Sequence, residues 1–162
     1  MTDREEIIEI LARYVRANDH RSGSALGELF TEDVLIEIFQ HDGKGGRKQL
    51  APPTRGRDTI VDVYDNLMPP HESRGWSHHV TLDHLVSVDG DRATVNAQFI
   101  MFRVRGDQEP VGGWPKGTYG AQGTIAPEES GYYESDLLRE NGAWRIAHHR
   151  VIHDIPFVIP AA

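Results

Sequence analysis

The sequence lacks cysteine altogether, and this absence excludes several kinds of chemistry at once. A disulfide framework, a thiolate metal site and a cysteine nucleophile all require the missing side chain. Long apolar runs are absent too, since none approaches the roughly 18 residues that span a bilayer. The acidic stretch from Met1 to Glu6 does not resemble a signal peptide. We therefore expect a cytoplasmic protein with no membrane partner.

Positive charge is also scarce. The chain of 162 residues has 17 Lys and Arg against 25 Asp and Glu, which gives a formal net charge of −8. Nucleic-acid binding depends on basic residues that neutralise phosphates, so no nucleic-acid partner is expected. The phosphate loop GxxxxGK[ST], the dinucleotide fingerprint GxGxxG and the Gly-x-Ser-x-Gly elbow of serine hydrolases are missing. The length indicates one domain over residues 1–162, large enough to bury its own core.

Helices come first along the chain and strands follow. Apolar residues recur at helical spacing over about 3–18, behind a capping box of Thr2 and Glu5. Shorter helices are predicted over 24–30 and 58–68, and loops over 41–56 and 106–131. Strands are predicted over 34–39, 76–88, 93–104, 132–139 and 143–155. This order is typical of an α+β fold, with helices packed on one face of a long, curved antiparallel sheet, a cone with an open mouth.

The strand predicted over 76–88 alternates between two faces. The polar face includes Ser77, His79 and Thr81. The opposite face is too apolar to leave in water, and we expect a homodimer or homotrimer to bury it. That face carries Trp76, His78, Val80, Leu82, His84, Val86 and Val88.

Asp19 is the strongest single candidate for a functional residue. It falls on the apolar stripe of the first predicted helix, where a carboxylate needs a partner; if the helix ends at Asn18, Asp19 is a solvated loop residue instead. Tyr14 lies at the edge of that stripe, so either its hydroxyl donates to a substrate oxygen, or the ring belongs to the core and its hydroxyl lies at the rim.

Nine histidines offer a partner for such a carboxylate, and a His–carboxylate pair is the commonest general base near neutral pH. The alternative is a metal site with Asp83 or Asp154, but no HExxH or comparable ligand spacing occurs. We therefore expect no metal and no cofactor. The histidines form two clusters: His78, His79 and His84, and His148, His149 and His153.

Several short pieces, in this order and spacing, resemble the SnoaL-like branch of the nuclear-transport-factor-2-like superfamily. The resemblance covers about residues 7–150 and implies a cone-shaped α+β barrel with its N-terminal helices on the concave face of the sheet. The pieces are Arg13-Tyr14 with Asp19, Leu29-Phe30-Thr31-Glu32-Asp33-Val34, His78-His79-Val80-Thr81, Val88-Asp89-Gly90-Asp91-Arg92-Ala93, Gly131-Tyr132-Tyr133, and Leu138-Arg139-Glu140-Asn141-Gly142-Ala143-Trp144-Arg145-Ile146.

Within that superfamily the chain looks similar to scytalone dehydratase, hexachlorocyclohexane dehydrochlorinase and bile-acid 7α-dehydratase, which are cofactor-free lyases. The resemblance implies that a strand histidine removes a proton and that an aspartate after the first helix orients it. Asp19 matches the aspartate, and Tyr14 matches a tyrosine five residues before it. His79 best matches the histidine because its strand face is polar; if that parity is wrong, His78 is the base.

The implied function is a cofactor-independent lyase or isomerase acting on a small, hydrophobic, cyclic molecule. The residues expected to line the substrate pocket are His78, His153, Tyr133, Phe102 and Asp136. The sequence departs from scytalone dehydratase at Phe102-Arg103, where that enzyme has a second histidine. Ile38 stands where ketosteroid isomerase has its base, so that chemistry is disfavoured. Two non-catalytic alternatives remain: a partner similar to the small subunit of ring-hydroxylating dioxygenases, and a ligand-binding protein.

Overall fold

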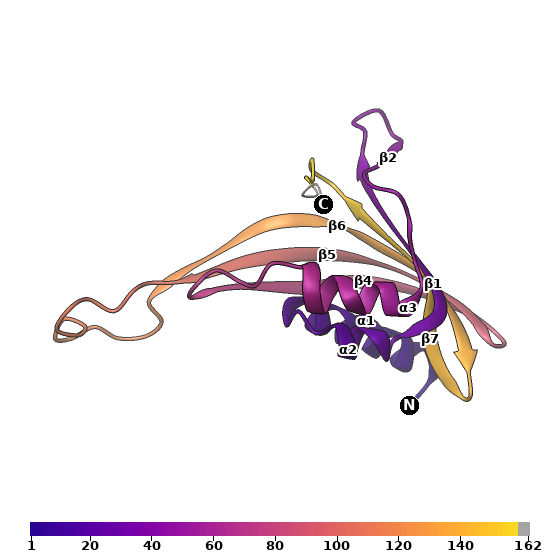
Figure 1. Cartoon of the computed structure of the whole chain (residues 1–162), viewed down its shortest axis with the longest axis horizontal. Coiled ribbons are helices and arrows are strands. Elements are labelled where there is room, and N and C mark those ends of the chain that lie inside the picture. The colour runs from indigo at the N-terminus through magenta and orange to yellow at the C-terminus, as the bar shows by residue number, and fades with distance from the viewer. Residues whose placement is uncertain (159–162) are drawn as a thin grey trace.

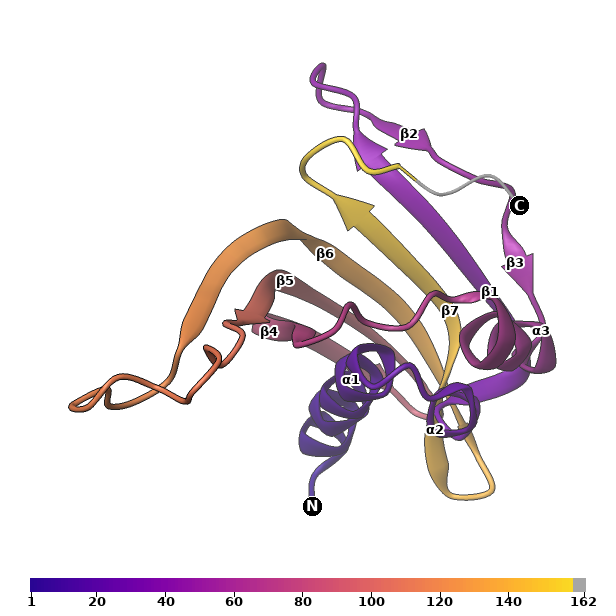
Figure 2. The same ribbon diagram turned by 60° about the vertical axis from the view of Figure 1, so that its left-hand side comes forward.

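A long, curved sheet dominates the computed structural model, which describes residues 1–158, and the helices lie inside its curve (Figures 1 and 2). The helical segments are α1 (Asp3–Asp19), α2 (Gly23–Gly27), α3 (Arg57–Asp62) and the π-helical turn η1 (Val63–Leu67). The strands are β1 (Phe30–His41), β2 (Arg47–Gln49), β3 (Thr54–Arg55), β4 (Gly75–Asp89), β5 (Arg92–Gly106), β6 (Gly123–Glu140) and β7 (Ala143–His153).

The strand order β2-β1-β7-β6-β5-β4 leaves the sheet open, with β3 paired to β1 beside this path. The α+β class and the helices on the concave face are confirmed. The sheet is mixed rather than purely antiparallel, because β1 and β7 run parallel. It does not close into a complete barrel, since β4 and the short β2 are its edges.

Helix α1 forms as its capping box predicts. The Thr2 hydroxyl accepts from the Glu5 amide at 3.3 Å, and the Glu5 carboxylate accepts from the Thr2 amide at 2.7 Å. The two bonds satisfy two of the amide groups that a helix start leaves open. The helix ends at Asp19, one residue beyond the predicted end, and Asp19 is only 4% exposed. The alternative of a solvated Asp19 is therefore wrong.

The other helices and strands differ more from their predicted boundaries. The predicted helix over 24–30 is shorter, because β1 already begins at Phe30. The helix predicted over 58–68 is α3 followed by η1, and the loop predicted over 41–56 contains β2 and β3. Strands β5 and β6 extend into the loop predicted over 106–131, so the irregular part is the arm 107–122, which projects away from the body (Figure 1).

A bulge in β4 changes which side chains share a face. The pairing with β5 shifts between Leu82 and Leu85, and Asp83 in between has a φ of 51°. Beyond the bulge, Val86 pairs with Val95, which is buried under the helices. Val86 and Val88 therefore lie on the concave face, and the prediction that they share a face with Val80 and Leu82 is wrong. The prediction assumed a regular alternation of side chains along the strand, and a regular alternation cannot show where a bulge inserts an extra residue.

The core lies between the concave face and the helices. No helix in the described range 1–158 is long and apolar enough to cross a membrane. The largest fully buried side chains include Tyr133, Phe30, Phe99, Ile7 and Leu11.

Candidate functional site

Asp19 and His79 form a buried pair between the end of α1 and the start of β4. The His79 ring donates from Nδ1 to Asp19 Oδ1 at 2.6 Å, and the two side chains are 10% and 6% exposed. Because a carboxylate only accepts, this bond keeps the proton on Nδ1 and leaves the lone pair on Nε2. The expected approach of two residues sixty positions apart is therefore observed.

Further contacts fix the Asp19 side chain. The His79 amide donates to Oδ2 at 2.9 Å, and the Ser77 hydroxyl donates to Oδ1 at 3.2 Å. The main-chain carbonyl of Asp19 accepts from Nε2 of His71 at 2.6 Å, and the His71 ring stacks on Trp76 with centroids 4.8 Å apart. Four donors from one segment of chain thus hold the end of α1 against β4, which pre-organises the pair.

Aromatic rings surround the pair on the concave face. The Phe99 ring lies 6.0 Å from His79 and is stacked on Tyr133 at 4.4 Å, measured between centroids. Gly131 makes room for this ring, because a Cβ there would come within 2.8 Å of Phe99 Cε1 and 2.0 Å of the Ile152 carbonyl oxygen. Tyr133 is 2% exposed and lies on the face where the sequence placed it.

Tyr14 lies deeper, packed edge-on against Tyr133 and 4.4 Å from the His149 ring. Burial raises the pKa of its hydroxyl well above the usual value, and the nearby phenol groups of Tyr64 and Tyr133 add to this. Burial also raises the pKa of Tyr64, to about 12. Both hydroxyls are therefore protonated donors at neutral pH.

Glu129 and His153 face the pair from β6 and β7. The His153 ring lies 5.8 Å from Phe99 and 4.0 Å from Phe157, and its Nδ1 is 3.7 Å from Glu129 Oε2. His153 is 5% exposed, and its Nδ1 has no hydrogen-bond partner among residues 1–158. Burial lowers the pKa of His153 to about 4, so this ring is neutral near pH 7.

Three residues predicted to line the pocket lie on the other face of the sheet. His78 is exposed and pairs across strands with Phe102 on the convex side, so neither side chain approaches Asp19. Asp136 also points to the convex side, where its carboxylate accepts from Arg150 at 2.9 Å. The prediction is wrong for all three because side chains alternate along a strand and His79, Met101 and Ser135 take the concave positions.

Sequence reasoning missed Glu129, Tyr64, His71 and Arg21 as residues around the pair. Glu129 could have been found by extending the alternation of Tyr133 and Gly131 backwards by two residues, but Pro127 and the neighbouring glycines indicated a loop. Tyr64 lies within the helix predicted over 58–68. For His71 no signal in the sequence indicates its long-range bond to the Asp19 carbonyl.

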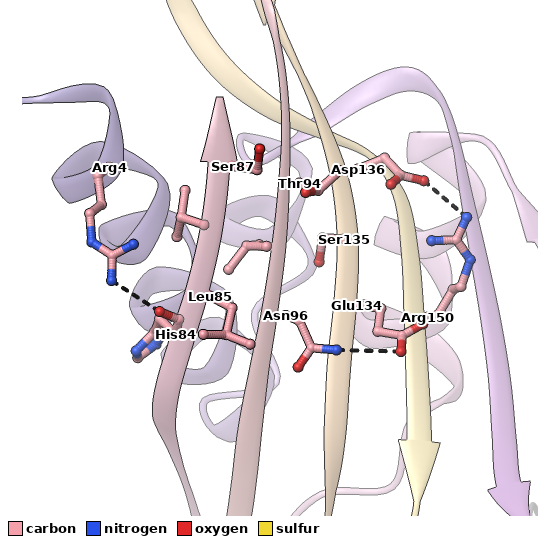
Figure 3. Close-up of a pocket in the computed structure, with 12 residues that line it drawn as sticks. Arg4, His84, Leu85, Ser87, Thr94, Asn96, Glu134, Ser135, Asp136 and Arg150 are labelled. Carbon is pink, nitrogen blue, oxygen red and sulfur yellow. Dashed lines mark hydrogen bonds and ion pairs between the residues drawn. The ribbon is translucent and has the colours of Figure 1, made fainter. Parts of the chain in front are cut away.

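Surface hollows occur elsewhere on the molecule. One, of about 490 Å³, is lined by Arg4 of α1 and by side chains of β4, β5, β6 and β7 (Figure 3). In it Asn96 bonds Glu134, and Arg150 faces Asp136. A second, of about 780 Å³, lies between α1, α2 and the start of β7. Neither includes Asp19 or His79.

Within residues 1–158 no group of three or more His, Asp or Glu is placed to hold a metal ion.

The open, curved sheet with helices in its concavity is a nuclear-transport-factor-2-like fold. The model of the SnoaL-like domain matches residues 1–150, and the chain belongs to that family. A search of curated proteins finds no match.

Solved structures share the fold at low sequence identity. A β subunit assigned to an aromatic-ring-hydroxylating dioxygenase of Novosphingobium aromaticivorans aligns with a TM-score of 0.70 and 16% identity, over 96% of this chain and 91% of that chain. Rv3472 of Mycobacterium tuberculosis, in a D-to-N variant and of unknown function, aligns with a TM-score of 0.63 and 26% identity, over 94% and 76%. An NTF2-like protein with a cystatin-like fold from N. aromaticivorans aligns with a TM-score of 0.62 and 23% identity, over 93% and 81%.

Proposed function

We propose that this protein is a cofactor-independent lyase or isomerase that acts on a small, hydrophobic, cyclic molecule by proton abstraction. The observation that carries the proposal is the buried 2.6 Å bond from His79 Nδ1 to Asp19, which presents Nε2 as a base. A neutral imidazole oriented by a carboxylate accepts a proton and is stabilised as imidazolium by the same carboxylate.

The surroundings suit a cyclic, apolar substrate. Phe99 and Tyr133 are stacked on each other beside His79 and make its surroundings aromatic and apolar. Tyr14, paired with Tyr64, is the donor assigned to the substrate's carbonyl oxygen, where charge develops when the neighbouring carbon loses its proton. General-base catalysis contributes about 10²–10⁴-fold, and binding against these rings has to supply the rest by positioning.

The test is proton abstraction in D₂O with a panel of cyclic ketones and hydroxy-ketones. We expect deuterium to enter the carbon next to the carbonyl, or an enone to form, as followed by mass spectrometry and NMR. His79→Gln abolishes the reaction, and His78→Gln, on the opposite face of the same strand, preserves it. Equal activity of the wild type and His79→Gln would contradict the proposal.

A second candidate function is favoured by the likeness to the dioxygenase β subunit. In that case the chain is a non-catalytic partner of a larger subunit, or a protein that binds a ligand and leaves it unchanged. Stable binding of a panel compound without exchange or turnover, equally by the wild type and His79→Gln, supports this candidate.

A further inference from the structure

Elimination of water from a hydroxy-ketone requires two proton transfers, and the Asp19–His79 pair performs only one. The base removes the proton next to the carbonyl, but hydroxide is a poor leaving group until its oxygen receives a proton. A dehydratase therefore needs a donor on the far side of the substrate. This inference rests on the proposed function and concerns the identity of that donor.

Strand pairing places Glu129 across the concave face from His79. His79 on β4 pairs with Met101 on β5, which pairs with Glu129 on β6. Two strand spacings separate the outer residues, roughly 10 Å between backbones. The Phe99 ring lies between them, 6.0 Å from the His79 ring and 5.8 Å from the His153 ring that accompanies Glu129. His79 and the Glu129–His153 pair therefore flank Phe99, and a substrate that spans this position on the concave face would reach both groups.

A bulge in β6 separates Glu129 from the carboxylate next to it. Met101 pairs with Glu129 while Phe102 pairs with Pro127, so Glu128 is the extra residue. Glu128 forms an ion pair with Arg103, with a hydrogen bond of 2.7 Å. Glu129 instead turns to the concave face, where its side chain is 21% exposed and its Oε2 lies 3.7 Å from Nδ1 of His153.

The surroundings of Glu129 stabilise its protonated form relative to that of an exposed glutamate. Burial raises its pKa above the usual value, and the charge of Glu128 adds to the effect. His79, Arg103 and Arg21 act in the opposite direction, but burial outweighs them. His153 does not hold Glu129 as an anion, because burial keeps the imidazole uncharged near pH 7.

We propose that Glu129 is the general acid of this site, which protonates the leaving oxygen while His79 removes the carbon-bound proton. The C–H bond breaks and its proton goes to His79 Nε2, and the electron pair forms the new C=C bond. The C–O bond breaks, its pair stays on oxygen, and the Glu129 proton completes a water molecule. Imidazolium His79 and carboxylate Glu129 then return to their starting forms by a net transfer of one proton, so no external co-reactant is needed.

Leaving-group dependence tests this assignment. The probes are 3-hydroxycyclohexanone, which loses water, and its acetate ester, whose leaving group departs as a stable anion without a proton. We expect Glu129→Gln to slow loss of water by about 10²-fold or more and to leave loss of acetate near the wild-type rate. Glu128→Gln is the matched control and retains both reactions. If Glu129→Gln slows loss of water and loss of acetate equally, Glu129 is not the general acid, and the role of His79 as base is unaffected. If His79→Gln retains both reactions, the proposed function itself is overturned.

A second measurement needs no turnover. The side-chain carboxyl carbons of ¹³C-labelled glutamate are titrated by NMR, and the Glu129 signal is identified by its loss in Glu129→Gln. We expect the Glu129 midpoint to lie above the ordinary value of 4.5. A Glu129 midpoint at or below 4.5 would overturn the proposal, whatever the protein's substrate.

Discussion

At the scale of single residues, the organisation of the site depends on how Asp19 is held. Its carboxylate accepts hydrogen bonds from the His79 ring, the His79 amide and the Ser77 hydroxyl. Its main-chain carbonyl accepts one from the His71 ring. A charged acceptor buried to this degree is stable only when it is satisfied by several donors. The same bonds set the tautomer of His79, so structure and chemistry depend on one carboxylate.

Replacement of Asp19 by Asn tests this dependence. The amide keeps the shape but does not accept from all of these donors, and it favours the tautomer with the proton on Nε2. We expect proton abstraction to fall by about 10²-fold or more, and ¹⁵N NMR of His79 to show the changed tautomer. Ser77→Ala, which removes one bond of 3.2 Å and leaves the pair, has a much smaller effect. An unchanged tautomer in Asp19→Asn would contradict the assignment.

His149 makes stability depend on pH. Its side chain is fully buried, and burial lowers its pKa to about 3 from 6.5. The unfolded chain therefore binds a proton that the folded chain excludes. This contribution to stability is fully present above pH 6.5 and is lost as the pH falls towards 3.

We expect the free energy of unfolding to fall between pH 6 and pH 4, with His149 contributing up to about 1.4 kcal/mol per pH unit. His149→Gln, which can still bond Ser135, reduces this slope in urea titrations at several pH values. His78→Gln, exposed in the fold, is the control and retains it. An identical slope in the wild type and His149→Gln would exclude His149 as the cause.

At the scale of elements, the bulge in β4 decides which valines reach the core. Asp83 takes a φ of 51°, a conformation that Gly and Asp tolerate and β-branched residues do not. Asp83→Val should therefore lower the free energy of unfolding by about 1–2 kcal/mol, and Asp83→Gly should change it little. Denaturant titrations measure both. Ser87→Val, exposed on the regular part of the same strand, is the control, and an equal loss there would remove the bulge as the explanation.

At the scale of the whole molecule, the convex face of β4 and β5 remains open in the single chain. Val80 and Leu82 are each 40% exposed on it, beside the partly buried Ile100 and Phe102. Val80 pairs with Ile100 across the strands, and the four side chains together form an apolar surface of the kind that monomers rarely leave in water.

We expect a homodimer or homotrimer that buries this face. Light scattering at micromolar concentration should give a multiple of the chain mass, and Val80→Glu with Leu82→Glu should shift it to that of the monomer. Leu67→Glu, exposed on η1 far from the face, leaves the oligomer unchanged. A monomeric wild type would contradict this prediction.

The sequence by itself determined the local and periodic features of this protein. The capping box and the apolar stripe fixed α1, the order of elements fixed the α+β class, and strand parity with the family resemblance indicated Asp19 and His79. These signals lie within one turn of helix or along one strand, where spacing alone decides which side chains lie together.

Only the tertiary structure decided which neighbours complete the site. The bulges at Asp83 and Glu128 depend on how β4, β5 and β6 pair, and each changes the face of every residue beyond it. Phe102 and Asp136 were misplaced because alternation tells which residues share a face but not which face is covered by helices. Glu129 was missed because it lies in the segment predicted as a loop, into which the pairing of β6 with β5 extends the strand. That choice is made when α1 packs into the concavity and carries the buried Asp19 to His79.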